Sequence, residues 1–158
     1  MGAHHGCSRM TDIVIVTGDI VDSGRIRDLC LIKPGCSFSH VIKRVYNSIA
    51  WDFSPVNYII YRGDSFWGAF TQHPEYAMLS VKQFQERLYE AFAVYGIPDA
   101  RARFALWYGD VDTSSIPLEM NLGEAFTWSD KTLIQMKATP SIMVETNVGD
   151  SFTYEELL

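Results

Sequence analysis

Two aspartates, each directly preceded by a glycine, follow the most apolar runs of the chain. Asp19 lies in the segment TGDIVDS after the run IVIV, and Asp64 lies in the segment IIYRGDSF. Carboxylates are preferred ligands of Mg²⁺, which completes its octahedral shell with waters and substrate phosphates. We therefore predict a divalent-metal site that holds a polyphosphate, with Asp19 and Asp64 as metal ligands and Mg²⁺ or Mn²⁺ as the ion.

This site requires that Asp19 and Asp64 converge although they are far apart in the sequence. They become neighbours if the first strand pairs with a hairpin formed by the next two strands. Two close carboxylates raise each other's pKa, and a bound cation removes the repulsion. A Gly-Asp pair after a strand is also a common turn dipeptide, so the prediction depends on the two occurrences together.

Residues close to these aspartates in the sequence are candidates for contacts with phosphate. The short residues after Asp19 leave main-chain N–H groups available to phosphate oxygens. Asp22 and Ser23 are candidates for phosphate contacts or for support of the metal ligands, and capping of the loop explains them equally well. Arg62 is a candidate for a phosphate contact or for an ion pair with a surface carboxylate.

The apolar pattern predicts the elements that must position these residues. The predicted strands cover residues 12–18, 56–62, 66–71, 100–108 and 141–145, and the predicted helices cover 38–49, 74–95 and 123–137. A loop with Gly24 and Pro34 is expected before the first helix, which Ser37 is placed to cap. The order β-α-β-β-α-β-α-β predicts an α+β, ferredoxin-like split βαβ fold with additions, whose antiparallel-containing sheet carries helices on one face.

The composition is that of one globular domain. Of 158 residues 47% are hydrophobic, and we expect a single domain over residues 11–158 after a disordered extension over residues 1–10. The net charge of −6 argues against direct nucleic-acid binding, and no apolar run approaches the roughly 20 residues of a membrane span. Cys7, Cys30 and Cys36 are an odd set without a CxxC pair, so we predict no disulfide framework and a reducing, cytoplasmic location.

Four segments in order, TGDIVDS, RGDSF, DARARFALWYGDV and GEAFTWSDKTLIQMK, resemble the SatD family of bacterial proteins. More distantly, they resemble the catalytic domains of class III nucleotidyl cyclases and of GGDEF diguanylate cyclases. The resemblance implies that Asp19, followed by Ile20, and Asp64 match the two aspartates that bind metal ions and hold the triphosphate. It also places Thr127 and Lys131 at the asparagine and arginine positions of a cyclase helix that orients ribose and stabilises the transition state.

Two functional hypotheses follow from this resemblance. The first is a domain that binds a divalent metal and a nucleoside triphosphate, with a nucleotidyl cyclase-type activity. The alternative is a catalytically degenerate regulatory module that acts as a dimeric interaction domain. It is motivated by Thr127 and Lys131, because a lysine cannot reproduce the bidentate guanidinium fork of arginine.

The resemblance further implies a symmetric homodimer, since cyclase-like domains generally build their active site across a two-fold interface. Trp67, Trp107 and Trp128 lie near the motif segments, and we expect the hairpin of residues 58–71 at or near the contact. The competing interpretation is that these tryptophans fill the core of a monomer. SatD-like proteins often continue into a helix-turn-helix region, so this sequence is either a short member or a fragment.

Overall fold

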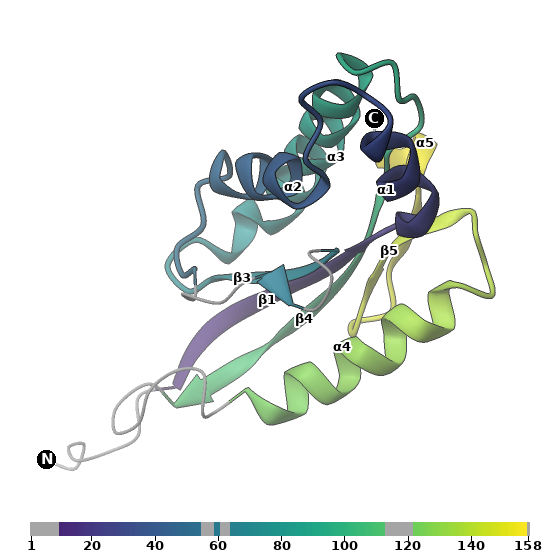
Figure 1. Cartoon of the computed structure of the whole chain (residues 1–158). Helices are drawn as coiled ribbons and strands as arrows, with labels where there is room; N and C mark the ends of the chain where they lie inside the picture. Colours follow the sequence, from purple (N-terminus) through teal and green to yellow (C-terminus); the bar gives the residue numbers. More distant parts are fainter. Residues whose placement is uncertain (1–9, 55–58, 61–63, 113–121, 158) are drawn as a thin grey trace, which may run out of the picture.

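The computed structural model describes residues 10–54, 59–60, 64–112 and 122–157 (Figure 1). The strands are β1 (Met10–Ile20), β2 (Ile59–Ile60), β3 (Ser65–Phe70), β4 (Ala102–Asp112), β5 (Ile142–Thr146) and β6 (Ser151–Thr153). The helices are α1 (Ser23–Leu31), α2 (Phe38–Asn47), α3 (Ala77–Ala93), α4 (Gly123–Met136) and α5 (Tyr154–Leu157), with a 3₁₀ turn, η1 (Pro74–Tyr76), before α3.

The long strand β1 lies inside the sheet, whose strand order is β2-β3-β1-β4-β5-β6. It pairs antiparallel with both β3 and β4, while β4 pairs parallel with β5. The aliphatic run explains this position, because alternate residues of a strand face opposite sides of the sheet. Val14 and Val16 are buried in one core, and Ile13 and Ile15 are buried in another.

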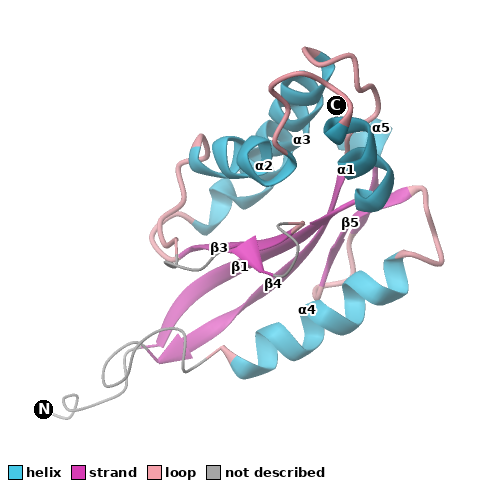
Figure 2. Cartoon of the chain, viewed as in Figure 1, coloured by secondary structure: helices cyan, strands magenta, loops and turns pink. Residues whose placement is uncertain are grey.

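Helices cover both faces of the sheet (Figure 2). The larger core contains buried side chains of α1, α2, α3 and α5, whereas α4 packs on the opposite face. The α+β, ferredoxin-like fold is confirmed, but the prediction that all helices share one face is wrong in respect of α4. The physical reason is a second apolar patch on the sheet, which includes Ile13, Ile15 and Trp67 and which Leu122 and Ala125 cover.

Two predicted segments differ from the structure. The segment between the first strand and α2, expected to be a loop, contains the helix α1. Its apolar periodicity is weak because two of its nine residues, Ile26 and Cys30, are buried. Ser37 stands at the N-cap of α2 but makes no capping hydrogen bond with its side chain. Residues 1–9 of the expected extension over residues 1–10 lie outside the described residues, whereas Met10 begins β1. Most of the predicted strand 56–62, including Arg62, also lies outside the described residues.

Of the three tryptophans near the motif segments, Trp67 is buried within the chain. Trp67 is 6% exposed and packs edge-to-face on Phe126 with ring centroids 4.8 Å apart. The monomer-core interpretation therefore holds for Trp67. Trp107 and Trp128 are half-buried.

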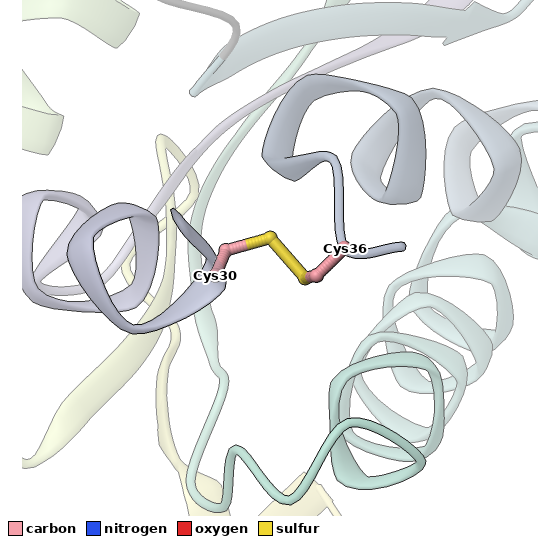
Figure 3. Close-up of a disulfide and its surroundings, with 2 residues drawn as sticks. All are labelled: Cys30 and Cys36. Carbon is pink, nitrogen blue, oxygen red and sulfur yellow. A yellow bond between two sulfur atoms is a disulfide. The ribbon is translucent and has the colours of Figure 1, made fainter. Parts of the chain in front are cut away.

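Cys30 and Cys36 form a disulfide with an S–S distance of 2.06 Å (Figure 3). The prediction that no disulfide is present is wrong. It rested on the odd number of cysteines and the absence of a CxxC pair, whereas the turn at Pro34 and Gly35 folds the chain back after α1 and brings Cys36 to Cys30. A loop of this length stabilises the folded state by about 2 kcal/mol through restriction of the unfolded chain. The disulfide also removes the argument from cysteine usage for a reducing compartment.

No helix within the described residues is both long and apolar enough to cross a membrane.

Asp12 and Asp110 lie directly opposite each other on β1 and β4. The hydrogen bond and the negative charge of Asp12 raise the pKa of Asp110 above its ordinary value of 3.8. The folded protein then holds this proton more strongly than the unfolded chain, so stability declines as pH rises through the raised pKa. We expect Asp110→Asn to increase the melting temperature at pH 7 relative to wild type, and to lose this advantage below pH 3.8.

Thermal unfolding of both proteins across this pH range checks the prediction. Asp28→Asn on the exposed side of α1 is the control for removal of one negative charge. An equal gain in melting temperature for the two variants would show that net charge, and not the Asp12–Asp110 pair, is responsible.

Candidate functional site

A cleft of about 500 Å³ lies where β1 ends. Its walls come from β1, the start of α1, the chain at the start of β3, β4 and the residue after α4. The lining residues are Asp19, Ile20, Val21, Asp22, Ser23, Asp64, Ser65, Arg103 and Lys137. The structure thus brings together the sequence-predicted residues Asp19, Ile20, Asp22, Ser23 and Asp64.

The pairing of β1 with β3 explains why the two aspartates meet. Asp19 is the register partner of Ser65, the residue directly after Asp64. The N–H of Ile20 donates a hydrogen bond of 3.0 Å to the carbonyl oxygen of Asp64. The predicted proximity of Asp19 and Asp64 is therefore confirmed, while their role as metal ligands stays a prediction.

A shared contact between the two motifs explains the glycine before Asp19. A Cβ atom placed on Gly18 would lie 2.5 Å from Cζ of Phe66, which is too close for any side chain. Phe66 belongs to the second motif and is itself buried against Phe84, with ring centroids 4.5 Å apart. The absent side chain of Gly18 lets this aromatic core approach β1 at the residue before Asp19.

Asp19 is held by an arginine on the neighbouring strand. Arg103 lies opposite Asp19 in the β1–β4 register, and its Nε is 3.2 Å from Oδ1 of Asp19. The two side chains are only 10% and 17% exposed. Burial raises the pKa of Asp19 above 3.8 and the charge of Asp64 adds to this, whereas Arg103 and Lys137 act in the opposite direction.

Asp64 is supported by α1. Ser23 Oγ donates a hydrogen bond of 2.8 Å to Oδ2 of Asp64, and Nη2 of Arg27 lies 3.9 Å from the same oxygen. Asp22, in the left-handed conformation with φ 54°, precedes α1. Its exposed carboxylate pairs with Arg25 at 2.9 Å, which places it at the rim of the cleft.

The main-chain N–H groups after Asp19 are partly used within the protein. Ile20 donates to Asp64, and Val21 donates a hydrogen bond of 2.8 Å to the carbonyl of Arg101. The prediction that this whole turn offers free N–H groups is therefore wrong for these two residues. The first turn of a helix leaves its N–H groups unpaired, so the start of α1 at Ser23 and Gly24 is where the backbone could donate to a ligand of this cleft.

Thr127 and Lys131 do not line this cleft. Both are exposed on α4, and Thr127 Oγ1 donates to the carbonyl oxygen of Gly123 at 2.9 Å. The cation that α4 brings to the cleft of its own chain is Lys137, the residue that follows the helix. Neither Lys137 nor Arg103 was predicted from the sequence. A charged residue such as Arg103 within the otherwise apolar segment 102–108 of β4 is a sequence signal that could have indicated a functional role.

The donor set fits a metal ion that arrives together with phosphate. In the described part of the chain, no group of three or more His, Cys, Asp or Glu side chains could hold a metal ion by itself. Proteins usually bind Mg²⁺ through one or two carboxylates, while phosphates and waters complete the coordination shell, and the pair Asp19 and Asp64 fits this pattern. The contacts of Arg103 and Ser23 use Oδ1 of Asp19 and Oδ2 of Asp64, so each carboxylate retains its second oxygen for a cation.

The fold around this cleft is nucleotidyl cyclase-like. Two solved structures, each described as a bacterial light-regulated adenylyl cyclase, match 89% and 90% of the chain with TM-scores of 0.56 and 0.54 at 13% identity. The chain spans less than half of those proteins, 44% and 45% of their lengths. At this identity the likeness establishes the fold alone.

No protein-family model matches the chain, and no curated protein matches it. The SatD resemblance therefore stays a prediction.

Proposed function

We propose that this domain, SatD-like in sequence, binds a divalent cation together with a nucleoside triphosphate in the cleft at the end of β1. One observation carries the proposal: Asp19 and Asp64 converge on a cleft that Arg103 and Lys137 also line. Carboxylates alone favour a cation, and basic groups alone favour an anion. The combination suits a metal–polyphosphate complex, which presents both charges.

Six of the nine lining residues have a distinct task in this proposal. Asp19 and Asp64 would hold Mg²⁺ or Mn²⁺, and Arg103 and Lys137 offset the negative charge of the phosphates. Ser23 orients Asp64 and, with the start of α1, offers N–H groups to phosphate oxygens. Ile20 contributes its main chain, which ties Asp64 to β1. The bound metal would supply charge neutralisation of the phosphates and activation of the attacking hydroxyl.

Isothermal titration with ATP and GTP, with and without Mg²⁺ or Mn²⁺, tests binding. We expect heat from triphosphate only when the divalent cation is present, because the metal-free cleft contains carboxylates that repel phosphate. Inorganic tripolyphosphate separates recognition of the phosphates from recognition of the nucleoside. Absence of metal-dependent heat at millimolar ligand would refute the proposal.

Cyclase activity would require a second copy of the chain. Thr127 and Lys131 are exposed on α4 and do not line the cleft of their own chain, so they are available to the cleft of a partner copy. We therefore predict a homodimer, with the half-buried Trp107 near the contact. Light scattering at micromolar concentration should give about twice the 17.9 kDa monomer mass.

Trp107→Ala should shift this equilibrium toward the monomer, and Tyr89→Ala on the exposed side of α3 is the matched aromatic control. A wild-type mass near 17.9 kDa would refute the dimer. A dimer that Trp107→Ala leaves intact would refute this choice of contact.

The regulatory alternative is favoured by the same two residues. Thr127 hydrogen-bonds within α4, and lysine at position 131 cannot form a bidentate fork with phosphate. Incubation of the protein with each triphosphate, followed by mass spectrometry for a cyclic product, separates the hypotheses. A product that Asp19→Ala abolishes would rule out a degenerate site. The cytoplasmic location expected from the sequence stays a prediction, and the Cys30–Cys36 disulfide removes the cysteine argument for it.

A further inference from the structure

Helix α1 has few buried contacts and one covalent anchor. Of its nine residues, Ile26 and Cys30 are buried, and Leu31 at its end is 78% exposed. Cys30 is also one half of the disulfide to Cys36, which stands in the segment leading into α2 (Figure 3). A helix with so little buried apolar surface is prone to local opening, and the disulfide opposes this opening.

The same helix carries two side chains that contact Asp64. Ser23 donates a hydrogen bond to the Asp64 carboxylate, and Arg27 lies 3.9 Å from it. The guanidinium of Arg27 also lies over the ring of Phe38, 4.6 Å from its centroid. Because Phe38 begins α2, this contact and the disulfide both hold α1 against α2. The position of α1 therefore determines whether Ser23 and Arg27 can support Asp64.

We propose that Cys30 and Cys36 form a thiol–disulfide switch that fixes α1 beside Asp64 when oxidised and releases the helix when reduced. The co-reactant is a low-molecular-weight thiol of the glutathione class. Its thiolate attacks Sγ of Cys36, which is half-buried while Cys30 is buried. The S–S bond breaks, and its electron pair goes to Sγ of Cys30, which takes up a proton.

A second small thiolate then attacks the sulfur of the small molecule attached to Cys36. This step forms the small-molecule disulfide and releases Cys36 as a thiolate, which is protonated in turn. Overall, two small thiols are oxidised, the protein disulfide is reduced, and the two protons of the small thiols reside on Cys30 and Cys36. Release of α1 is independent of the proposed ligand, whereas an effect on binding rests on the proposed function.

Hydrogen exchange followed by mass spectrometry tests the release of α1. A Cys7→Ser background leaves Cys30 and Cys36 as the two cysteines, and thiol titration verifies the oxidised and reduced forms. Upon reduction we expect the amides of α1 to exchange about tenfold faster, while those of α4 on the opposite face stay unchanged. In the double variant Cys30→Ala/Cys36→Ala, the α1 amides should exchange as fast as in the reduced form, and addition of reductant should not change their rate. Equal exchange of α1 in both redox forms, or two free thiols under oxidising conditions, would overturn the switch.

Titration with Mn²⁺–tripolyphosphate tests the link to the cleft. We expect reduction to weaken binding severalfold in the Cys7→Ser protein and to leave the Cys30→Ala/Cys36→Ala protein unaffected. If neither redox form binds while α1 still responds to reductant, the proposed function fails and the switch stands. If α1 responds but both forms bind equally, the link between α1 and Asp64 is refuted.

Discussion

Asp19→Asn and Asp64→Asn should each reduce metal-dependent triphosphate binding by at least about 100-fold. An amide oxygen can replace the carboxylate as hydrogen-bond acceptor for Arg103 or Ser23, but it lacks the negative charge that a hard divalent cation requires. Both variants should therefore keep the fold and lose the ligand. Calorimetry with Mg²⁺ and ATP measures the loss, and Asp130→Asn, on the exposed side of α4, is the matched control.

The pH dependence of binding provides a second check on Asp19. Burial raises the pKa of Asp19 above 3.8, so protons compete with the cation at a higher pH than for an ordinary aspartate. Affinity should fall as pH decreases through this raised pKa and recover as pH increases again. In Asp19→Asn the pH dependence of any residual binding should be weaker than in wild type, because this carboxylate no longer exchanges a proton for the cation. A wild-type affinity that stays constant down to pH 3.8 would contradict the role of Asp19.

Phe66→Ala should lower the free energy of unfolding by about 3–5 kcal/mol, the range for removing a buried aromatic ring. Phe66 is 1% exposed and contacts the rings of Phe84, Phe104 and Tyr46. Its loss leaves a cavity against Gly18, the residue before Asp19. Urea denaturation measures the change, and Tyr89→Ala, at an aromatic side chain that is 44% exposed, should cost less than about 1 kcal/mol.

Phe66→Leu tests whether packing at residue 66 also affects ligand binding. Leucine refills part of the cavity, so it should recover part of the stability lost in Phe66→Ala. Asp64 lies directly before β3, so its position depends on how β3 packs. Phe66→Ala should therefore weaken metal-dependent binding, and Phe66→Leu should restore part of it. A Phe66→Ala protein as stable as wild type would show that the aromatic cluster is dispensable.

The parts of the fold that could be predicted from the sequence are those with a strong apolar period. The strand around Ile15 and the helices α2, α3 and α4 have such a pattern, and their order determines the ferredoxin-like class. The helix α1 lacks a strong apolar period, because two of its nine residues are buried and two positions do not define a repeat. The side of the sheet on which α4 lies depends on residues far apart in the sequence, such as Ile13 and Ala125, and no local pattern encodes it.

The candidate site divides in the same way. Asp19 and Asp64 were predictable because each ends an apolar run and because the hairpin pairs with β1. Arg103 and Lys137 were not predicted, since their place in the cleft depends on the β1–β4 register and on where α4 ends. The disulfide likewise depends on a turn that closes in three dimensions. Spacing alone does not distinguish Cys30 and Cys36 from two free thiols.

The cleft draws its side chains from β1 near the start of the chain and from Lys137 after α4 near its end. No contiguous fragment shorter than this span contains all of them, so a ligand that needs the whole set recognises the assembled domain and not the unfolded chain. Binding energy is then added to the global free energy of folding, by about 2.7 kcal/mol at a ligand concentration of 100 times Kd. In a cell, the concentration of such a ligand would therefore influence how long the protein survives proteolysis, whether or not the ligand is chemically transformed.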